Sequence, residues 1–211
     1  MLEVRELACA RGERRLFSQL SFALAAGKLL RVAGKNGSGK TSLLRILCGL
    51  LHPEAGEVRW NDTPIKTLRE DYHRSLVYIG HVSGIKDELT PLENLGIAAT
   101  LAGVSADRTT QLAALDAFGV RGCADLAVRH LSQGQKRRVA LSRLALSASL
   151  PLWILDEPFT ALDVHAVASL ERLLASHVGA GGIVVLTTHM EVAIAAADMV
   201  RIDLDALERR A

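Results

Sequence analysis

A short glycine-rich segment, residues 34–41, is the part of the sequence best suited to chemistry. It reads Gly-Lys-Asn-Gly-Ser-Gly-Lys-Thr and matches the pattern GxxxxGK[ST]. Glycines let the backbone turn so that its amides point inward at phosphate oxygens, and a helix starting near Lys40 would add its positive dipole end. Lys40 would reach the β- and γ-phosphates of a nucleotide, and the Thr41 hydroxyl would hold Mg²⁺. The alternative is a glycine-rich turn that only starts a helix. The residues expected to bind ATP here are Gly34, Lys35, Asn36, Gly37, Ser38, Gly39, Lys40, Thr41 and Ser42.

Two adjacent carboxylates, Asp156 and Glu157, follow the apolar residues 152–155. The end of a buried strand beside a phosphate-binding loop is where a magnesium ligand and a general base belong. We expect Asp156 to bind Mg²⁺ directly or through water, and Glu157 to orient and deprotonate the attacking water. An Asp-Glu-Pro triplet is also a common turn after a strand, but the glycine loop favours the catalytic interpretation. Together with Lys40, these groups would hydrolyse ATP.

A third motif precedes a helical pattern that carries basic residues in its first turns. It consists of Leu131, Ser132, Gln133, Gly134 and Gln135. Ser132 and Gln135 have the spacing of a capping box, so a well-capped helix start is one interpretation. A capping box does not explain Gly134, which leaves room for a backbone to approach a ligand, nor the place of the motif shortly before Asp156.

The elements that would position these groups follow from the apolar pattern. Alternation predicts antiparallel strands ahead of the glycine loop, with a break at Gly12. Leucines at helical spacing predict a helix after the loop, with Leu50 and Leu51 on its buried face. Apolar bursts predict central parallel strands, and their alternation with helical segments favours an α/β sheet with helices on both faces. The expected strands are residues 4–7, 16–24, 29–33, 57–60, 76–79, 152–155 and 183–186, and the expected helices are residues 40–51, a helical insertion within 92–146, and 164–175.

The composition limits the classes of function. With 211 residues we expect one domain, and a net charge of +2 makes a nucleic-acid partner unfavourable. Charged residues interrupt the apolar runs, so no stretch is expected to span a membrane, and the N-terminus lacks the layout of a signal peptide. Cys9, Cys48 and Cys123 lie in no paired or metal-binding spacing, and we interpret them as reduced, mostly buried thiols.

The third motif carries a family resemblance. Residues 131–135 resemble the LSGGQ signature of ABC ATPases, with Gln133 in place of the commoner glycine. The resemblance implies a P-loop NTPase fold: an α/β core with a parallel sheet, an antiparallel β subdomain at the N-terminus and an inserted helical subdomain. It divides the single domain 1–211 into a RecA-like core, about 1–80 and 150–211, and a helical subdomain, about 82–148. It also implies that residues 131–135 bind the γ-phosphate of ATP held by a second subunit, so that a homodimer with two composite sites forms on ATP binding.

Further matches extend the resemblance over the chain. Asp163, after Ala161 and Leu162, resembles the D-loop that communicates across the dimer. His189, after two threonines, resembles the switch histidine that contacts the γ-phosphate, and we expect it to be catalytic. A lone histidine after an apolar strand is more often structural, but the order and spacing of the motifs favour the functional interpretation.

Two positions depart from the pattern of the family. Arg11, ahead of Gly12, stands where most members have an aromatic residue that stacks on adenine. A guanidinium can also stack on a base, so Arg11 is counted among the ATP-binding residues. His81 stands at the position of the Q-loop glutamine, where a neutral imidazole could accept a hydrogen bond from water or ligate a metal. The alternative for His81 is a solvent-facing loop residue.

The sequence around the motifs is similar to that of the ATP-binding subunits of haem ABC exporters of cytochrome c maturation. The similar segments are residues 16–22, 78–86, 89–95 and 181–189. That resemblance implies separate transmembrane subunits and a peripheral place on the cytoplasmic face of a bacterial inner membrane. The seven histidines form no ligand cluster and no Cys-x-x-Cys-His occurs, so we expect that this subunit does not bind haem directly.

Rival functions remain open. An ABC exporter for another cargo would share every motif, and so would a soluble ABC protein of translation or DNA repair, although such proteins usually carry two ATPase units or a long insertion. A P-loop kinase would share only the glycine loop and would pass phosphate to an acceptor instead of releasing it. A nucleotide-binding scaffold without activity is disfavoured, since Lys40, Asp156, Glu157 and His189 are all present.

Overall fold

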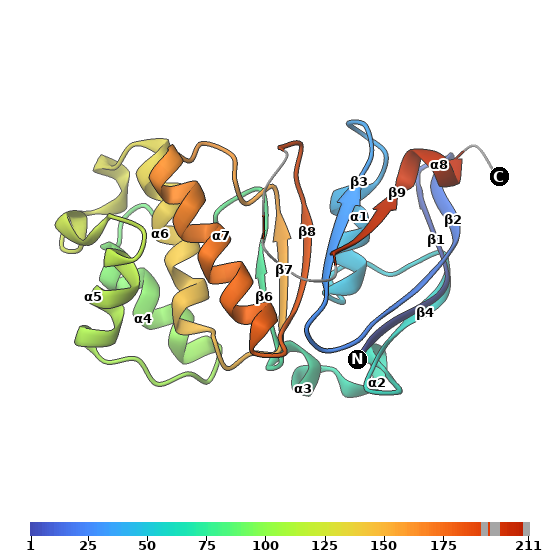
Figure 1. The fold of residues 1–211 in the computed structure, drawn as a ribbon, viewed down its shortest axis with the longest axis horizontal. Coiled ribbons are helices and arrows are strands. Elements are labelled where there is room, and N and C mark those ends of the chain that lie inside the picture. The colour runs from blue at the N-terminus through green and yellow to red at the C-terminus, as the bar shows by residue number, and fades with distance from the viewer. Residues whose placement is uncertain (191–193, 195–198, 209–211) are drawn as a thin grey trace.

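Two β-sheets form the frame of the protein, whose structure is a computed structural model describing residues 1–190, 194 and 199–208. The antiparallel sheet has the strand order β2-β1-β4-β5, and the parallel sheet has the order β6-β7-β8-β3-β9. In Figure 1 the antiparallel sheet lies on the right, the parallel sheet in the middle and a group of helices on the left.

The antiparallel sheet is built from alternating apolar residues. Its strands are β1 (Leu2–Arg11), β2 (Arg14–Leu24), β4 (Ala55–Trp60) and β5 (Thr63–Pro64). On β1 the side chains of Leu2, Val4 and Leu7 are buried, as expected for a sheet with one face on the core. The register between β1 and β2 shifts between Val4 and Leu7, where Glu6 adopts a positive φ of 46°. The strand expected over residues 4–7 thus contains this irregularity and extends beyond it on both sides, from Leu2 to Arg11.

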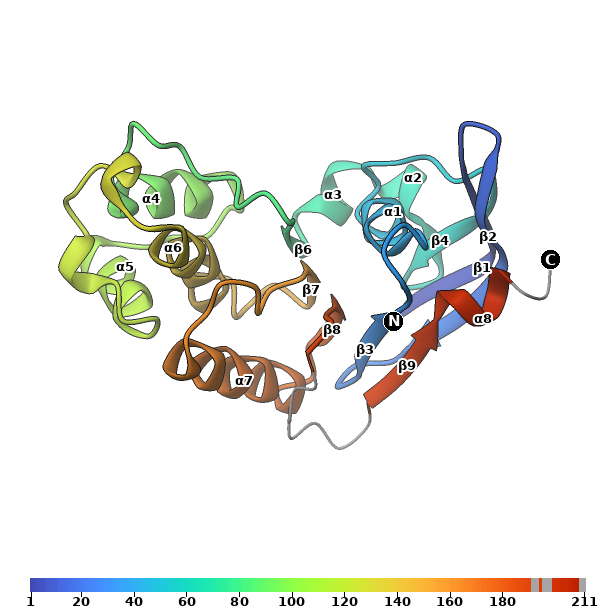
Figure 2. The same ribbon diagram turned by 90° about the horizontal axis from the view of Figure 1, so that it is seen from above.

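The parallel sheet consists of β3 (Leu29–Ala33), β6 (Leu76–Ile79), β7 (Leu152–Asp156), β8 (Ile183–Thr187) and β9 (Met199–Asp203). Every residue of β7 and β8 is buried, because helices cover both faces of this sheet. Figure 2 shows α1 (Lys40–Leu47) and α7 (Val164–Gly179) on opposite sides of β7 and β8. The expected α/β fold with a parallel sheet and an N-terminal antiparallel sheet is therefore confirmed.

Helices between β6 and β7 lie together at one end of the molecule (Figures 1 and 2). They are α4 (Pro91–Leu101), α5 (Arg108–Asp116) and α6 (Gln133–Leu146), with two 3₁₀ turns, η1 (Arg121–Cys123) and η2 (Val128–His130). Three short helices, α2 (Ile65–Leu68), α3 (Glu70–His73) and α8 (Leu204–Glu208), lie elsewhere. Within the described ranges, none of the helices combines the length and apolar character needed to cross a bilayer.

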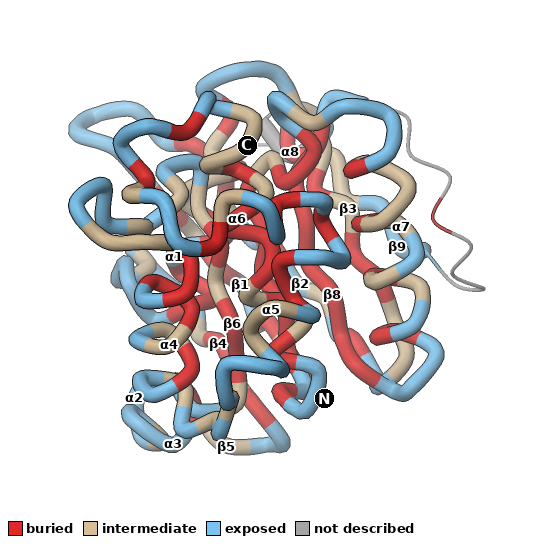
Figure 3. Tube along the Cα trace, turned by 90° about the vertical axis from the view of Figure 1, so that its left-hand side faces the viewer, coloured by how far each residue is buried: buried red, intermediate tan, exposed pale blue. Residues whose placement is uncertain are grey.

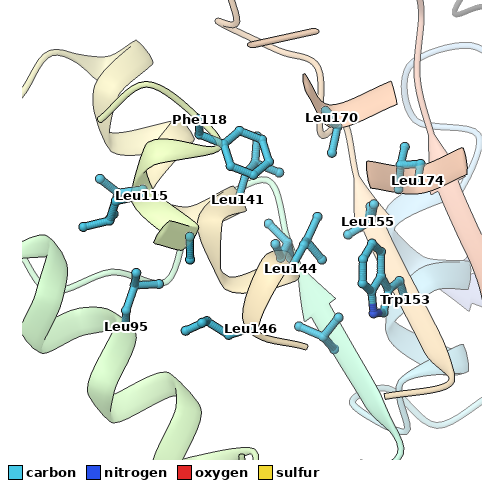
Figure 4. Packing of buried hydrophobic residues seen from close by; sticks show 14 of the residues in the cluster. Leu95, Leu115, Phe118, Leu141, Leu144, Leu146, Trp153, Leu155, Leu170 and Leu174 are labelled. Atoms are coloured by element: carbon cyan, nitrogen blue, oxygen red, sulfur yellow. The ribbon is translucent and has the colours of Figure 1, made fainter. Parts of the chain in front are cut away.

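The parallel sheet separates two hydrophobic cores. On β7, Trp153 and Leu155 face a core shared with α4, α5, α6 and α7, part of which is drawn in Figure 4. Leu152 and Ile154 of the same strand face a second core, which includes α1 and the antiparallel sheet. Burial in Figure 3 follows this arrangement, since long buried stretches run along the strands and exposed segments lie at the periphery.

One helix ends earlier than the sequence predicted. Residues 40–51 were expected to form a single helix, but α1 ends at Leu47. Gly49 adopts a left-handed conformation with φ 72°, the usual way in which a helix is terminated. As a result, Leu50 and Leu51 are 61% and 38% exposed, and the prediction that they lie on the buried face was wrong.

The cysteines are free, as expected. Cys9 and Cys48 are buried and Cys123 is half-buried. None of the three lines the cavity described below, but Cys123 Sγ accepts a hydrogen bond from Gln135 Nε2 at 3.5 Å.

Candidate active site

A cavity of about 570 Å³ opens where β3 and β7 end. It brings together residues from the hairpin formed by β1 and β2, the glycine loop, the loop after β6 and the ends of β7 and β8. The expected site residues that line it are Arg11, Asn36, Gly37, Gly39, Lys40, Thr41, Ser42, His81, Asp156, Glu157 and His189. The same lining includes Arg14, Leu16 and Thr160, which the sequence did not single out.

The glycine loop joins the end of β3 to the start of α1, and its geometry requires glycine at two positions. At Gly34, with φ 143°, a Cβ would lie 2.4 Å from Ser38 Oγ. At Gly39, with φ 100°, a Cβ would lie 3.2 Å from ring atoms of Phe17. Side chains here would therefore push the loop out of the shape that surrounds the cavity.

Lys40 begins α1 and folds back over the loop. Its ammonium donates hydrogen bonds to the carbonyl oxygens of Gly34 at 2.7 Å and Lys35 at 3.0 Å. The side chain is 9% exposed and lines the cavity. A positive charge thus lies at the place where the pattern predicts phosphate, next to the N-terminus of α1.

Asp156 is nearly fully buried, with 2% exposure, and both of its carboxylate oxygens accept hydrogen bonds from hydroxyls. Thr41 Oγ1 donates to Oδ2 and Thr187 Oγ1 donates to Oδ1, each at 2.8 Å. The Thr41 hydroxyl and the Asp156 carboxylate are hard oxygen ligands of the kind that Mg²⁺ prefers, often alongside phosphate oxygens and water. The donor set therefore fits a magnesium ion.

Glu157 has an unusual backbone conformation for a residue with a side chain, with φ 49°. Its amide donates a hydrogen bond to Thr187 Oγ1 at 2.9 Å. Its Oε1 lies 3.3 Å from His189 Nε2, an approach without hydrogen-bond geometry, so among the described residues this oxygen has no donor. A carboxylate oxygen without a donor can accept a proton from a water in the cavity.

His81 is exposed and lines the same cavity. It therefore lies in the same cavity as Thr41, Asp156 and Glu157, and within the described part of the chain no hydrogen bond or ion pair joins it to them. Arg11 lines the cavity from the end of β1, in the hairpin that β1 forms with β2.

The signature residues occupy a different place. Ser132 caps α6: Gln135 N–H donates to Ser132 Oγ at 3.2 Å and Ser132 N–H donates to Gln135 Oε1 at 2.8 Å. Ser132 and Gln133 are exposed, and a Cβ at Gly134 would lie 3.1 Å from the Ala161 carbonyl oxygen. The lining of the cavity includes none of the described residues from Leu131 to Gln135. The capping box exists, and the exposed helix start remains available to a second subunit.

Asp163 also has a local structural role. It caps α7 by accepting a hydrogen bond from the Ala166 amide at 2.8 Å, and this bond lowers the pKa of its carboxyl. Arg138 of α6 lies 3.4 Å from the same carboxylate. The D-loop position and the signature helix are therefore linked on the surface.

Thr187 is a further residue at the site to which the sequence analysis assigned no role. It is fully buried and joins the Asp156 carboxylate to the Glu157 amide. The register pairs Asp156 with Thr187 on neighbouring parallel strands. A polar residue directly after the apolar residues 183–186 is the signal that could have found it, because the carboxyl ends of parallel strands meet at one edge.

Comparisons with known proteins give consistent results. The sequence profile of the ABC transporter family matches residues 17–160. The chain is 55% identical over 191 residues to the "Cytochrome c biogenesis ATP-binding export protein CcmA" of Aromatoleum aromaticum, covering 90% of this chain and 89% of that protein.

Solved structures share the fold. One titled "Structure of ATP binding subunit of ABC transporter" has a TM-score of 0.81 and 27% identity, covering 90% of this chain and 80% of the other. A dimeric post-hydrolysis state of the ATP-binding cassette MJ0796, bound to ADP and Pi, has a TM-score of 0.82 and 24% identity, covering 96% and 94% of the two chains. The second likeness concerns the fold alone.

Proposed function

Because this chain belongs to the ABC transporter family, and within it to the cytochrome c biogenesis ATP-binding export proteins, we propose that it drives a haem exporter by hydrolysing ATP. Family membership makes it the ATP-hydrolysing subunit of a membrane transporter. The observation that carries the proposal is the single cavity in which Lys40, Thr41, Asp156 and Glu157 converge. The haem cargo is proposed from the similarity to proteins named for cytochrome c biogenesis.

The residues of the cavity divide the reaction between them. The glycine loop, residues 34–39, and the start of α1 bind the phosphates through backbone amides. Lys40 exchanges its bonds to the Gly34 and Lys35 carbonyls for phosphate oxygens. Thr41 and Asp156 would hold Mg²⁺, which would supply positive charge to offset that of the nucleotide phosphates. The Asp156 carboxylate is already oriented for this by two hydroxyls.

Glu157 acts as the general base. Its Oε1 has no donor within the described part of the chain, so it can accept the proton of the water that attacks the γ-phosphate. His189, 3.3 Å from the same oxygen, contacts the γ-phosphate. Arg11 stacks against the adenine from the hairpin, and His81 orients water at the same cavity.

Two copies form the active unit on ATP binding. The signature residues, Leu131 to Gln135, contact the ATP bound to the second copy, and Asp163 meets the partner beside them. The exposed N-terminus of α6 supports this arrangement, because the capping box engages only the amides of Ser132 and Gln135, and those of Gln133 and Gly134 can approach an anion outside their own subunit. The fold is also that of a cassette known as a dimer.

The remaining parts of the proposal concern the assembly. Separate transmembrane subunits carry the cargo, and this subunit lies peripherally on the cytoplasmic face of a bacterial inner membrane without binding haem or nucleic acid itself. Its core comprises about residues 1–80 and 150–211, and the helices from α4 to α6 form the helical subdomain, about 82–148.

The test combines partner identification with activity. Tagged wild-type protein is purified from detergent-solubilised membranes, co-eluting subunits are identified by mass spectrometry, and phosphate release is measured. The Glu157→Gln variant, with Glu70→Gln as a control at an exposed position, is then introduced into cells that lack the wild-type chain. We expect membrane subunits of cytochrome c maturation to co-elute and c-type cytochromes to disappear only with Glu157→Gln. Co-elution with the subunits of another exporter, with normal c-type cytochromes, would favour a different cargo.

A further inference from the structure

The guanidinium of Arg137 donates hydrogen bonds to three backbone carbonyl oxygens next to residues of the active site. Nη1 donates to the Gly80 carbonyl oxygen at 2.9 Å, and Nη2 donates to those of Asp156 at 3.1 Å and Glu157 at 2.8 Å. Arg137 lies in α6, which begins at the signature residues, and is 6% exposed. One side chain therefore connects the signature helix to the loop before His81 and to the end of β7.

The contact with Glu157 bears on its backbone strain. A φ of 49° is unfavourable for a residue with a Cβ and persists only where surrounding contacts enforce it. Thr187 Oγ1 accepts from the Glu157 amide, and Arg137 Nη2 donates to the Glu157 carbonyl. The residue is thus held on both sides, and the direction of its carboxylate depends on both hydrogen bonds.

Burial of the Arg137 guanidinium is unfavourable in free energy, because it removes a charged group from water. Burial lowers the pKa of its guanidinium, while the charges of Asp156 and Glu157 oppose that shift. Arginine remains protonated, so a positive charge is buried against carbonyl oxygens without a direct carboxylate partner among the described residues. Its Nε also lacks a hydrogen-bond partner there. The unfavourable free energy of burying this charge indicates that Arg137 orients the site and does not only pack in the core.

We propose that Arg137 is a positioning residue for ATP hydrolysis, which holds the general base Glu157 and the loop before His81 in a fixed relation to the signature helix. The inference rests on the proposed function. A movement of α6 on meeting the second subunit would reach the Glu157 backbone through this side chain. Lysine cannot replace it, because an ammonium lacks the rigid planar fork that reaches carbonyls on two strands.

The experiment compares Arg137→Lys and Arg137→Ala with Arg108→Lys, which changes an exposed arginine of α5. Turnover at saturating ATP, the Kd for a fluorescent ATP analogue and the melting temperature are measured for each. We expect kcat to fall by about 10- to 100-fold in both Arg137 variants, the usual effect of losing a group that orients a ligand. The Kd should be unchanged, and millimolar guanidinium should restore part of the kcat of Arg137→Ala while leaving the normal kcat of Arg108→Lys as it is.

Two results of these measurements would overturn the proposal. The first is a normal kcat in Arg137→Lys. The second is a parallel loss of kcat, ATP binding and melting temperature without guanidinium rescue, which would leave only a structural role. A crystal structure of Arg137→Lys provides a readout that does not depend on activity, since Glu157 should leave its positive φ; an unchanged Glu157 backbone contradicts the inference. Failure of the proposed function would differ, because the wild-type protein would then release no phosphate.

Discussion

Thr41 and Asp156, 115 residues apart in the sequence, are joined by a hydrogen bond of 2.8 Å from Thr41 Oγ1 to Asp156 Oδ2. The bond connects the first turn of α1 to the end of β7, so the two proposed magnesium ligands are brought together by the packing of the helix on the sheet. Pre-positioned ligands reduce the ordering that must accompany binding. The oxygen atoms that would receive Mg²⁺ with ATP are therefore set by the fold.

Lys40→Ala should abolish tight binding of Mg-ATP. The substitution removes the main cation facing the phosphates and also the two hydrogen bonds that hold the Gly34 and Lys35 carbonyls. Loss of a charged hydrogen-bonding group costs about 3 kcal/mol, which corresponds to roughly 100-fold in affinity. Titration with a fluorescent ATP analogue measures the effect, and Lys66→Ala, at an exposed position, is the control. Equal affinities in the two variants would remove Lys40 from the site.

Glu157→Gln should keep ATP binding but reduce turnover by roughly 10² to 10⁴, the usual contribution of a positioned acid or base. An amide is close in shape to a carboxylate but cannot accept the proton of the attacking water. Unhydrolysed ATP should then hold two copies together, which size-exclusion chromatography with ATP can detect. Glu70→Gln should behave as wild type, since Glu70 is exposed. A monomeric Glu157→Gln protein with normal turnover would refute the assignment.

The glycine loop, the acidic pair and the α/β fold could be predicted because each depends on residues that are adjacent in the sequence. The sequence signals a polar residue at Thr187, but its two partners depend on which strands are neighbours, and the role of Arg137 could not be predicted because it depends on where a long side chain reaches. The pairing of Asp156 with Thr187 follows from strand order, and the Arg137 contacts span as many as 57 residues. The early end of α1 was missed because the leucine pattern continues past Gly49 while the backbone turns.

Thr187 gives a prediction that tests this long-range part of the site. Thr187→Val keeps the shape but removes the hydroxyl that donates to Asp156 and accepts from the Glu157 amide. We expect the free energy of unfolding to fall by about 1–3 kcal/mol, because buried polar groups lose their partners, and ATPase activity to fall with it. Thr187→Ser should retain most of both. Urea unfolding and phosphate release measure the two effects, and identical behaviour of the valine and serine variants would contradict the assigned role.

His81 is predicted to act in place of the Q-loop glutamine. His81→Gln should preserve ATP hydrolysis in the assembled complex, because an amide oxygen can accept the same hydrogen bond. His81→Ala should weaken the stimulation of ATPase activity by the membrane subunits more than it weakens ATP binding. ATPase activity is measured for each isolated variant and for the complex reconstituted from that variant and the membrane subunits. If all three proteins behave alike, His81 is only an exposed loop residue.

The last prediction concerns a histidine far from the chemistry. His177 of α7 stacks on Trp153 of β7, with ring centroids 3.8 Å apart and an interplanar angle of 4°. The side chain is 6% exposed, and its Nε2 has no hydrogen-bond partner among the described residues. The fit is close, because a Cβ at Gly182 would lie 2.2 Å from this nitrogen. A proton on the ring would therefore be poorly solvated.

Burial lowers the pKa of His177 from its ordinary value of 6.5 to about 4. Between these pH values His177 binds a proton in the unfolded chain but not in the folded chain. The stability that neutral His177 provides is therefore complete above about pH 6.5 and is lost as the pH falls towards about 4. The free energy of unfolding should fall over this window by up to about 3 kcal/mol. Urea unfolding at several pH values should show this slope in wild type and in His52→Gln, an exposed control, but a weaker slope in His177→Phe, whose ring cannot take up a proton. Equal slopes in wild type and His177→Phe would show that His177 does not titrate differently on folding.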